Sequence, residues 1–162
     1  MFQASVITCS DKGFKGLRED TSGEYIKNYL QDKGFFVVKK IIISDDLNSI
    51  KKELLEHADT LKVDLIITTG GTGFSPRDNT PEATKSVVLR EVPGISEMLR
   101  AESFKVTPKA YLSRGVSGIR NRTLIINLPG SLKAVKENLS FLDDVLNHGL
   151  KVLKNVDVEC GN

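Results

Sequence analysis

The stretch that decides the fold reads TTGGTGFSPRDNTPEA and covers residues 68–83. The apolar run at 64–67 immediately before it predicts a buried strand. After it, Thr80 as a cap, Pro81 at the first helical position and Glu82 in the first turn predict the start of a helix. The sequence therefore predicts a strand that ends in a glycine-rich loop, and a loop that leads into a helix.

The loop between that strand and that helix carries groups suited to a phosphorylated ligand. Its glycines let backbone N–H groups come close to a ligand, and loop amides beside a helix N-terminus favour phosphate. Arg77 adds a cation, and Asp78 adds a carboxylate that suggests a bridging divalent ion. A tight turn with a helix cap would explain the glycines alone, but neither Arg77 nor Asp78 is needed for a turn.

Two common nucleotide-binding motifs do not match this loop. No Gly-Lys-Ser/Thr follows the glycines, so the loop is not a P-loop. Pro76 stands where the dinucleotide-binding fingerprint has its third glycine.

Length and composition predict one globular domain over residues 1–162, with a core at about 4–153 and a frayed tail after it. The net charge of +2 favours neither nucleic acid nor a membrane surface as partner. No long apolar run predicts a membrane span, and the N-terminus lacks the features of a signal peptide. Cys9 and Cys160 form no ligand motif, so we expect a reduced, cytoplasmic protein.

Strands and helices alternate along the chain. Apolar runs predict strands at 4–9, 35–43, 64–67 and 123–128. Capping signals and apolar stripes predict helices at 21–33, 47–61, 80–90, 95–104 and from 132 to 153, whereas 113–118 is typical of a loop and 119–123 of a turn. This order predicts an α/β fold of three layers, with a mostly parallel sheet sandwiched between helices.

Polar loops follow several of the predicted strands, and in a parallel sheet these strand ends share one edge. The loops are Ser10-Asp11, Ser44-Asp45, the glycine loop and Pro129-Gly130-Ser131. They predict a groove that suits a ligand with more than one phosphate group. Asp45 and Asp46 are also typical acids of a helix N-terminus, and their spacing alone favours that interpretation.

Several other residues are predicted to have ordinary structural roles. His57 and His148 are expected on exposed helix faces, because neither has a partner at metal-ligand spacing. Cys9 and Phe74 are expected to pack inward. The runs Lys39-Lys40 and 120–122 are expected to be solvated charges.

Taken together, these motifs resemble the signature of the MogA/MoaB family, the molybdopterin adenylyltransferases of molybdenum cofactor biosynthesis. The resemblance covers about residues 4–153. It is carried by GGTG at 70–73, SPRD at 75–78, TPEA at 80–83, Ser10-Asp11, 44–46, 92–94, Ser113-Arg114 and 128–131.

The resemblance implies that AMP is transferred from ATP to the terminal phosphate of molybdopterin, with release of pyrophosphate. It implies Asp45 and Asp78 as catalytic residues that hold Mg²⁺. Binding of the pterin and the nucleotide is then assigned to Thr8, Ser10, Gly70, Gly71, Thr72, Gly73, Ser75, Arg77, Ser113, Pro129, Gly130 and Ser131. For Ser113 and Ser131, ordinary capping or turn bonding is an equal alternative.

The resemblance also implies a homo-oligomer, a trimer or a hexamer, and the molybdate-insertion protein as a partner. Met98, Phe104 and Tyr111 lie in a region with little predicted role in the core. Two other functions stay open from the sequence. One is a non-catalytic pterin- or nucleotide-binding module of the same fold. The other is a nicotinamide-nucleotide hydrolase, which is disfavoured because the extra domain of such proteins is not expected here.

Overall fold

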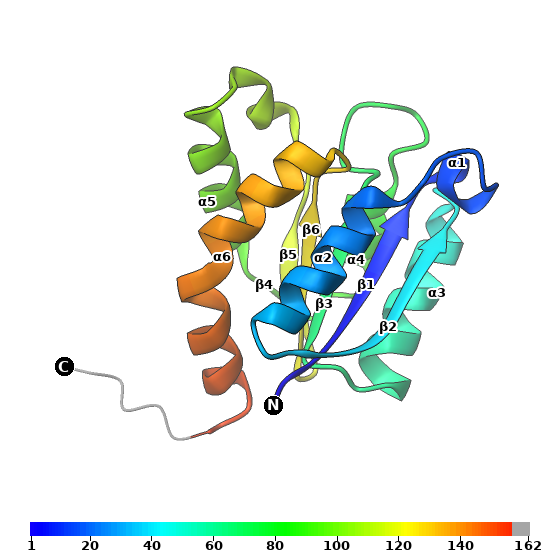
Figure 1. The fold of residues 1–162 in the computed structure, drawn as a ribbon. Coiled ribbons are helices and arrows are strands. Elements are labelled where there is room, and N and C mark those ends of the chain that lie inside the picture. Colours follow the sequence, from blue (N-terminus) through cyan, green and yellow to red (C-terminus); the bar gives the residue numbers. More distant parts are fainter. Residues whose placement is uncertain (157–162) are drawn as a thin grey trace.

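Six strands form one sheet in the computed structural model, which describes residues 1–156 (Figure 1). The strands are β1 (Gln3–Cys9), β2 (Phe36–Ile43), β3 (Leu65–Thr69), β4 (Arg90–Glu91), β5 (Ser117–Arg120) and β6 (Thr123–Leu128). The α-helices are α1 (Asp11–Phe14), α2 (Thr21–Asp32), α3 (Leu47–Leu55), α4 (Thr80–Val87), α5 (Pro93–Phe104) and α6 (Leu132–Leu153), with a π-helical segment η1 (Glu56–Thr60) and a 3₁₀-helix η2 (Pro108–Leu112).

The strand order is β2-β1-β3-β6-β5-β4. The four strands β2, β1, β3 and β6 are parallel to one another, and β5 and β4 complete the sheet by antiparallel pairing. The carboxyl ends of β1, β2, β3 and β6 therefore meet at one edge, from which the loops of Figure 1 emerge. The predicted three-layer, mostly parallel α/β fold is confirmed.

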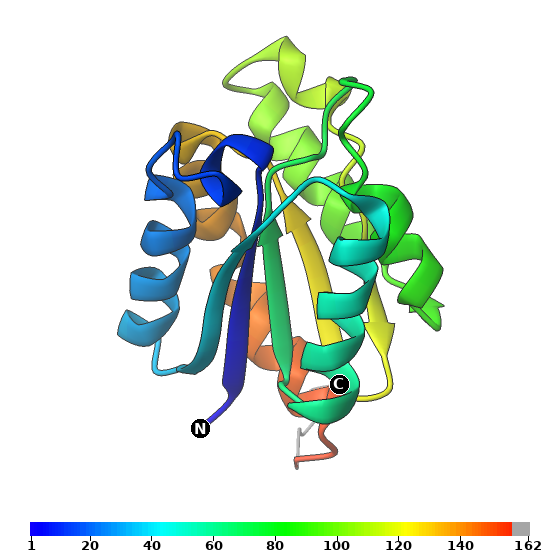
Figure 2. The same cartoon turned by 90° about the vertical axis from the view of Figure 1, so that its right-hand side faces the viewer.

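Helices cover both faces of the sheet (Figure 2). One buried cluster joins the sheet to α2, α5 and α6, and includes Ile26, Leu99 and Leu139. The other joins the opposite face to α3 and α4, and includes Leu54 and Ala83. Strand β3 lies between β1 and β6 with all five residues buried, as its continuous apolar run predicts.

The prediction of a loop and a turn at 113–123 was wrong in part, because β5 lies there and pairs with both β4 and β6. Strands of two and four residues are too short to show an alternating pattern. Helix α4 also ends at Val87 rather than at residue 90, since the chain turns there to enter β4. The cap of α2 is Asp20 instead of Thr21.

Cys160 and most of the predicted tail lie outside the described residues; of the tail, only 155 and 156 are described. Within residues 1–156, no helix has the length and apolar character needed to cross a membrane.

Two residues that we expected to be solvated at the surface make specific contacts within the protein. His57 is fully buried in the π-helical segment, and its Nδ1 lies 2.8 Å from the hydroxyl of Ser5. Arg120 forms a two-pronged ion pair with Asp59 and donates to the carbonyl of Val87. The expectation for His148 on an exposed position holds.

The burial of His57 makes stability depend on pH. Burial, assisted by the charge of Lys39, lowers the pKa of His57 from 6.5 to about 4. Below pH 6.5 the unfolded chain binds a proton that the folded chain does not, so stability is lost as pH falls toward 4. We expect the free energy of unfolding to fall by roughly 2 kcal/mol between pH 7 and pH 5 from this group.

Urea unfolding at the two pH values measures this loss. In His57→Asn, which keeps a polar atom near Ser5 but does not titrate, the loss over that interval should shrink by the same amount. An equal pH dependence in both proteins would contradict the assignment.

Candidate functional site

A cleft of about 840 Å³ opens at the sheet edge where β1, β2, β3 and β6 end. Of the predicted site residues, it is lined by Thr8, Ser10, Asp45, Gly70, Gly71, Ser75, Arg77, Asp78, Gly130 and Ser131. The remaining four, Thr72, Gly73, Ser113 and Pro129, line a second cavity of about 270 Å³. Because Thr72 and Gly73 belong to the same loop as Gly70 and Gly71, the glycine loop separates the two cavities.

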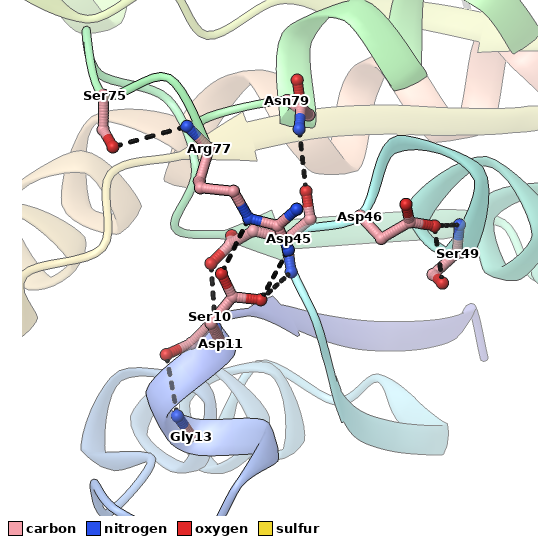
Figure 3. Close-up of polar contacts among 9 residues, drawn as sticks. All are labelled: Ser10, Asp11, Gly13, Asp45, Asp46, Ser49, Ser75, Arg77 and Asn79. Carbon is pink, nitrogen blue, oxygen red and sulfur yellow. Dashed lines mark hydrogen bonds and ion pairs between the residues drawn. The ribbon is translucent and has the colours of Figure 1, made fainter.

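Two aspartates join the loops that follow β1 and β2 (Figure 3). The amide of Asp11 donates to Asp45 Oδ2 at 2.8 Å, and the amide of Asp45 donates to Asp11 Oδ1 at 3.0 Å. The Asn79 side chain, at the end of the glycine loop, donates to the carbonyl of Asp45 at 2.9 Å. Three loops that are distant in sequence thus meet at Asp45.

Arg77 completes this cluster as a fork on Asp11. Its Nε and Nη2 lie 3.0 and 2.9 Å from the two carboxylate oxygens (Figure 3). The Arg77 hydrogen bond lowers the pKa of Asp11 to about 2. Asp46, in contrast, turns away and caps α3 through Ser49, so the alternative interpretation of a helix-terminus acid holds for Asp46.

One oxygen of Asp45 is left without a partner. Oδ1 is buried, and no hydrogen-bonding atom within the described residues reaches it. Burial raises the pKa of Asp45, and the nearby carboxylates of Asp11 and Asp78 add to this effect. A buried carboxylate oxygen that lacks a donor is costly unless a cation or a ligand completes it.

The glycine loop needs its first two glycines. Gly70 and Gly71 have φ angles of 91° and 66°, which other residues adopt only with strain. A Cβ on Gly70 would collide with the carbonyl of Cys9, and one on Gly71 with the Thr80 hydroxyl. Thr80 does not cap its helix as predicted; its hydroxyl donates to the Gly70 carbonyl at 2.9 Å.

Asp78 closes the far end of the loop, since its Oδ2 accepts from the amide of Ser75 at 3.1 Å. Its carboxylate lines the same cleft as that of Asp45. Phe74, which follows the glycines in sequence, is 70% exposed, so the expectation that it packs inward was wrong.

Four of the hydroxyls predicted to bind ligand already accept or donate a hydrogen bond within the protein. Ser10, Ser131 and Ser113 accept from the amides of Gly13, Ala134 and Gly115. The Thr8 hydroxyl donates to Asp20, which also pairs with Lys40 and accepts from Gly23. Lys40 is therefore not the freely solvated charge that we expected. Each serine keeps its hydroxyl hydrogen, which is free to donate to an anion.

The charge of the cleft fits a divalent cation. Its walls carry three cations, Lys12, Arg18 and Arg77, against five carboxylates, Asp11, Glu19, Asp20, Asp45 and Asp78. Mg²⁺ is typically held by one or two carboxylates together with water and phosphate oxygens. Within residues 1–156 no group of three or more His, Cys, Asp or Glu side chains is placed to hold a metal ion alone.

A family model described as "Probable molybdopterin binding domain" matches residues 5–148. The chain belongs to this family. The resemblance that the motifs indicate is therefore confirmed.

Relatives and solved structures agree with this membership of the molybdopterin-binding family. The molybdopterin adenylyltransferase of Helicobacter pylori J99 is 42% identical over 139 residues, which are 83% of this chain and 77% of that protein. The Escherichia coli K12 enzyme of the same name is 36% identical over 151 residues, which are 90% of this chain and 77% of that protein. The crystal structure of the molybdopterin biosynthesis enzyme MoaB from Thermus thermophilus is 46% identical, with a TM-score of 0.90 over 96% of this chain and 98% of that one.

Sequence reasoning missed several residues of this molybdopterin-binding domain. The motifs Ser10-Asp11 and Ser113-Arg114 predict ligand contacts for the two serines, but in the structure Asp11 and Arg114 are the members that hold loops together, Asp11 through Asp45 and Arg114 through Gly73. Asp20 and Asn79 lie outside the motifs that carry the family resemblance. A useful signal was available for Asp11, because an acid directly after a buried strand lies at the ligand-binding edge of the sheet.

We predict that Gly71→Ala destabilises this molybdopterin-binding domain more than Gly34→Ala. Both glycines have positive φ, at 66° and 83°, so both variants bear backbone strain of about 1–2 kcal/mol. No atom of the described residues lies within 4 Å of a Cβ on Gly34. On Gly71 the Cβ also displaces the Thr80 hydroxyl from its bond to Gly70, for a further loss of about 1 kcal/mol or more. Equal losses in urea unfolding would show that the loop has room for a side chain.

Proposed function

We propose that the protein is a molybdopterin adenylyltransferase, which transfers AMP from ATP to the terminal phosphate of molybdopterin and releases pyrophosphate. Relatives at 36–42% identity carry that name. The single observation in the structure that supports it most is the buried, unpartnered Oδ1 of Asp45, in a cleft that it shares with Asp78. Such an oxygen suits a metal that accompanies a polyphosphate.

The chain supplies two kinds of phosphate-binding group around the cleft. Helices α2 and α6 begin at its wall, at Thr21 and Leu132, and their first N–H groups favour anions. The loop at Gly70 and Gly71 contributes backbone to the wall of the cleft. These positions suit the phosphates of two substrates that approach from different sides of one cleft.

Asp45 and Asp78 would hold Mg²⁺, which when bound neutralises phosphate charge and aligns the reacting groups. The attacking phosphate is already an anion, so no residue of the cleft has to remove a proton from it. Asp11 positions Asp45 through the paired amide bonds, and Arg77 holds Asp11. The residues therefore act by positioning two anions and by compensating their charge.

We predict that Asp45→Asn and Asp78→Asn each reduce turnover about 100-fold or more, because each removes a charge that metal-assisted transfer needs. Asp46→Asn is the matched control. It makes the same substitution at the next residue, and asparagine also caps a helix, so turnover should stay close to that of the wild type. The measurement is pyrophosphate release with ATP, Mg²⁺ and molybdopterin, with adenylylated pterin identified by mass spectrometry.

Two outcomes would overturn the proposal. If the wild-type protein binds the pterin but releases no pyrophosphate, the non-catalytic binding module is the better description. If Asp46→Asn is the damaging variant and Asp45→Asn is not, the role belongs to the neighbouring residue.

We also propose a homo-oligomer, a trimer, that works in the cytoplasm. Phe104 and Tyr111 are 46% and 57% exposed, and their rings lie 4.8 Å apart on the surface formed by α5 and η2. Exposed aromatic pairs of this kind are typical of subunit interfaces. Light scattering should give the mass of three chains for the wild type and a smaller mass for Tyr111→Glu. A wild-type protein that is only monomeric at micromolar concentration would contradict this.

A further inference from the structure

We propose that Arg114 is the positioning residue of the glycine loop and that it sets the Asp78 carboxylate for the reaction. This inference rests on the proposed function for its kinetic part. Arg114 does not line the cleft. Its effect on the chemistry would therefore pass through the loop to Asp78.

The Arg114 guanidinium holds the loop at both ends. Nε donates to the carbonyl of Gly73 at 2.8 Å, and Nη2 donates to the carbonyl of Asp78 at 2.8 Å. Nη1 pairs with the carboxylate of Glu82, in the first turn of α4. The backbone amide of Arg114 also donates to the carbonyl of Thr72 at 2.9 Å.

Between these two anchored carbonyls, the backbone of the loop forms a small turn with its own hydrogen bonds, and the Arg77 side chain pairs with Asp11. The amide of Asp78 donates to the carbonyl of Ser75 at 2.9 Å, and the amide of Ser75 donates to Asp78 Oδ2 at 3.1 Å. These bonds close the turn but do not attach it to the rest of the protein. The Arg77 side chain attaches the turn to Asp11, and Arg114 attaches its backbone at Asp78 itself, so the position of the Asp78 residue depends on Arg114.

The residue type is specific to this task. A guanidinium is a planar fork that can serve two carbonyls and a carboxylate at once, whereas a lysine ammonium is a point charge on a flexible stem. All three nitrogens of Arg114 are engaged, so the residue is committed to the loop and not to a phosphate.

The segment that carries Arg114 is itself fixed. Arg100, on α5, donates to the carbonyl of Gly115 at 2.8 Å. Gly73 and Ser113 line the smaller cavity, while Asp78 lines the larger cleft. Arg114 therefore anchors the loop that forms the wall between the two cavities, and a shift of this side chain would move the lining of both.

The test compares Arg114→Gln and Arg114→Lys with Arg120→Gln. Arg120 is the matched control because its guanidinium, like that of Arg114, binds a carboxylate and a backbone carbonyl, at Asp59 and Val87, but away from the cleft. Both Arg114 variants should lower kcat at least ~10-fold while the KM for ATP changes less than ~3-fold, because misplacement of a reacting group affects the chemical step. Arg120→Gln should reduce thermal stability comparably and leave kcat unchanged.

A double variant separates positioning from general damage. If Arg114 acts through Asp78, Arg114→Gln combined with Asp78→Asn should be no slower than Asp78→Asn alone within about 2-fold. Losses that multiply, or full activity in Arg114→Lys, would overturn the proposal.

Amide hydrogen exchange tests the positioning without any substrate. Exchange across residues 73–78 should be faster in Arg114→Gln than in the wild type, and unchanged in Arg120→Gln. Unchanged exchange in Arg114→Gln would overturn the positioning role. Faster exchange in Arg114→Gln, together with a wild type that releases no pyrophosphate, would retain the positioning role and refute the proposed enzyme.

Discussion

The half-buried carboxylate of Asp45, with its buried Oδ1, is the constraint around which the functional edge of the sheet is built. Removing a carboxylate from water is unfavourable unless hydrogen bonds or a cation compensate it. The Asp11 amide satisfies one oxygen, and no donor within residues 1–156 satisfies the other. Arg77 binds the carboxylate of Asp11, and Asn79 binds the backbone of Asp45, so the loops after β1, β2 and β3 converge on this one group. Holding the Asp45 charge in this position costs local stability, and such a cost is typical of functional sites.

The glycine loop has two sides, and this explains why the predicted site residues divide between two cavities. Gly70, Gly71 and Asp78 face the larger cleft, whereas Thr72 and Gly73 face the smaller cavity. Because the glycine loop forms a wall of both the cleft and the smaller cavity, its position determines how the two are aligned with each other.

What the sequence predicts well is local, and what it predicts badly depends on distant contacts. The strand, loop and helix around the glycines follow from residues next to one another, and so does the order of strands and helices. The bonds of Asp11 to Asp45 and to Arg77 join residues 34 and 66 positions apart, which no spacing reveals. His57 lies at the spacing of the buried helical stripe of Ile50 and Leu54, so its burial follows from that spacing, whereas the lack of a metal-ligand partner does not indicate exposure. The strands β4 and β5 are too short for a pattern, and their pairing with β6 decides their structure.

We propose that the cleft accepts a polyphosphate together with a divalent cation, because its carboxylates outnumber its cations. Calorimetric titration of the wild-type protein with ATP, in Mg²⁺ and then in EDTA at the same ionic strength, tests this most directly. We expect the affinity for ATP to fall at least ~10-fold in EDTA, since a tetraanion then meets uncompensated carboxylates. We also expect Asp45→Asn to reduce this difference. Equal affinity for ATP in Mg²⁺ and in EDTA would show that the cleft does not bind the nucleotide together with a cation.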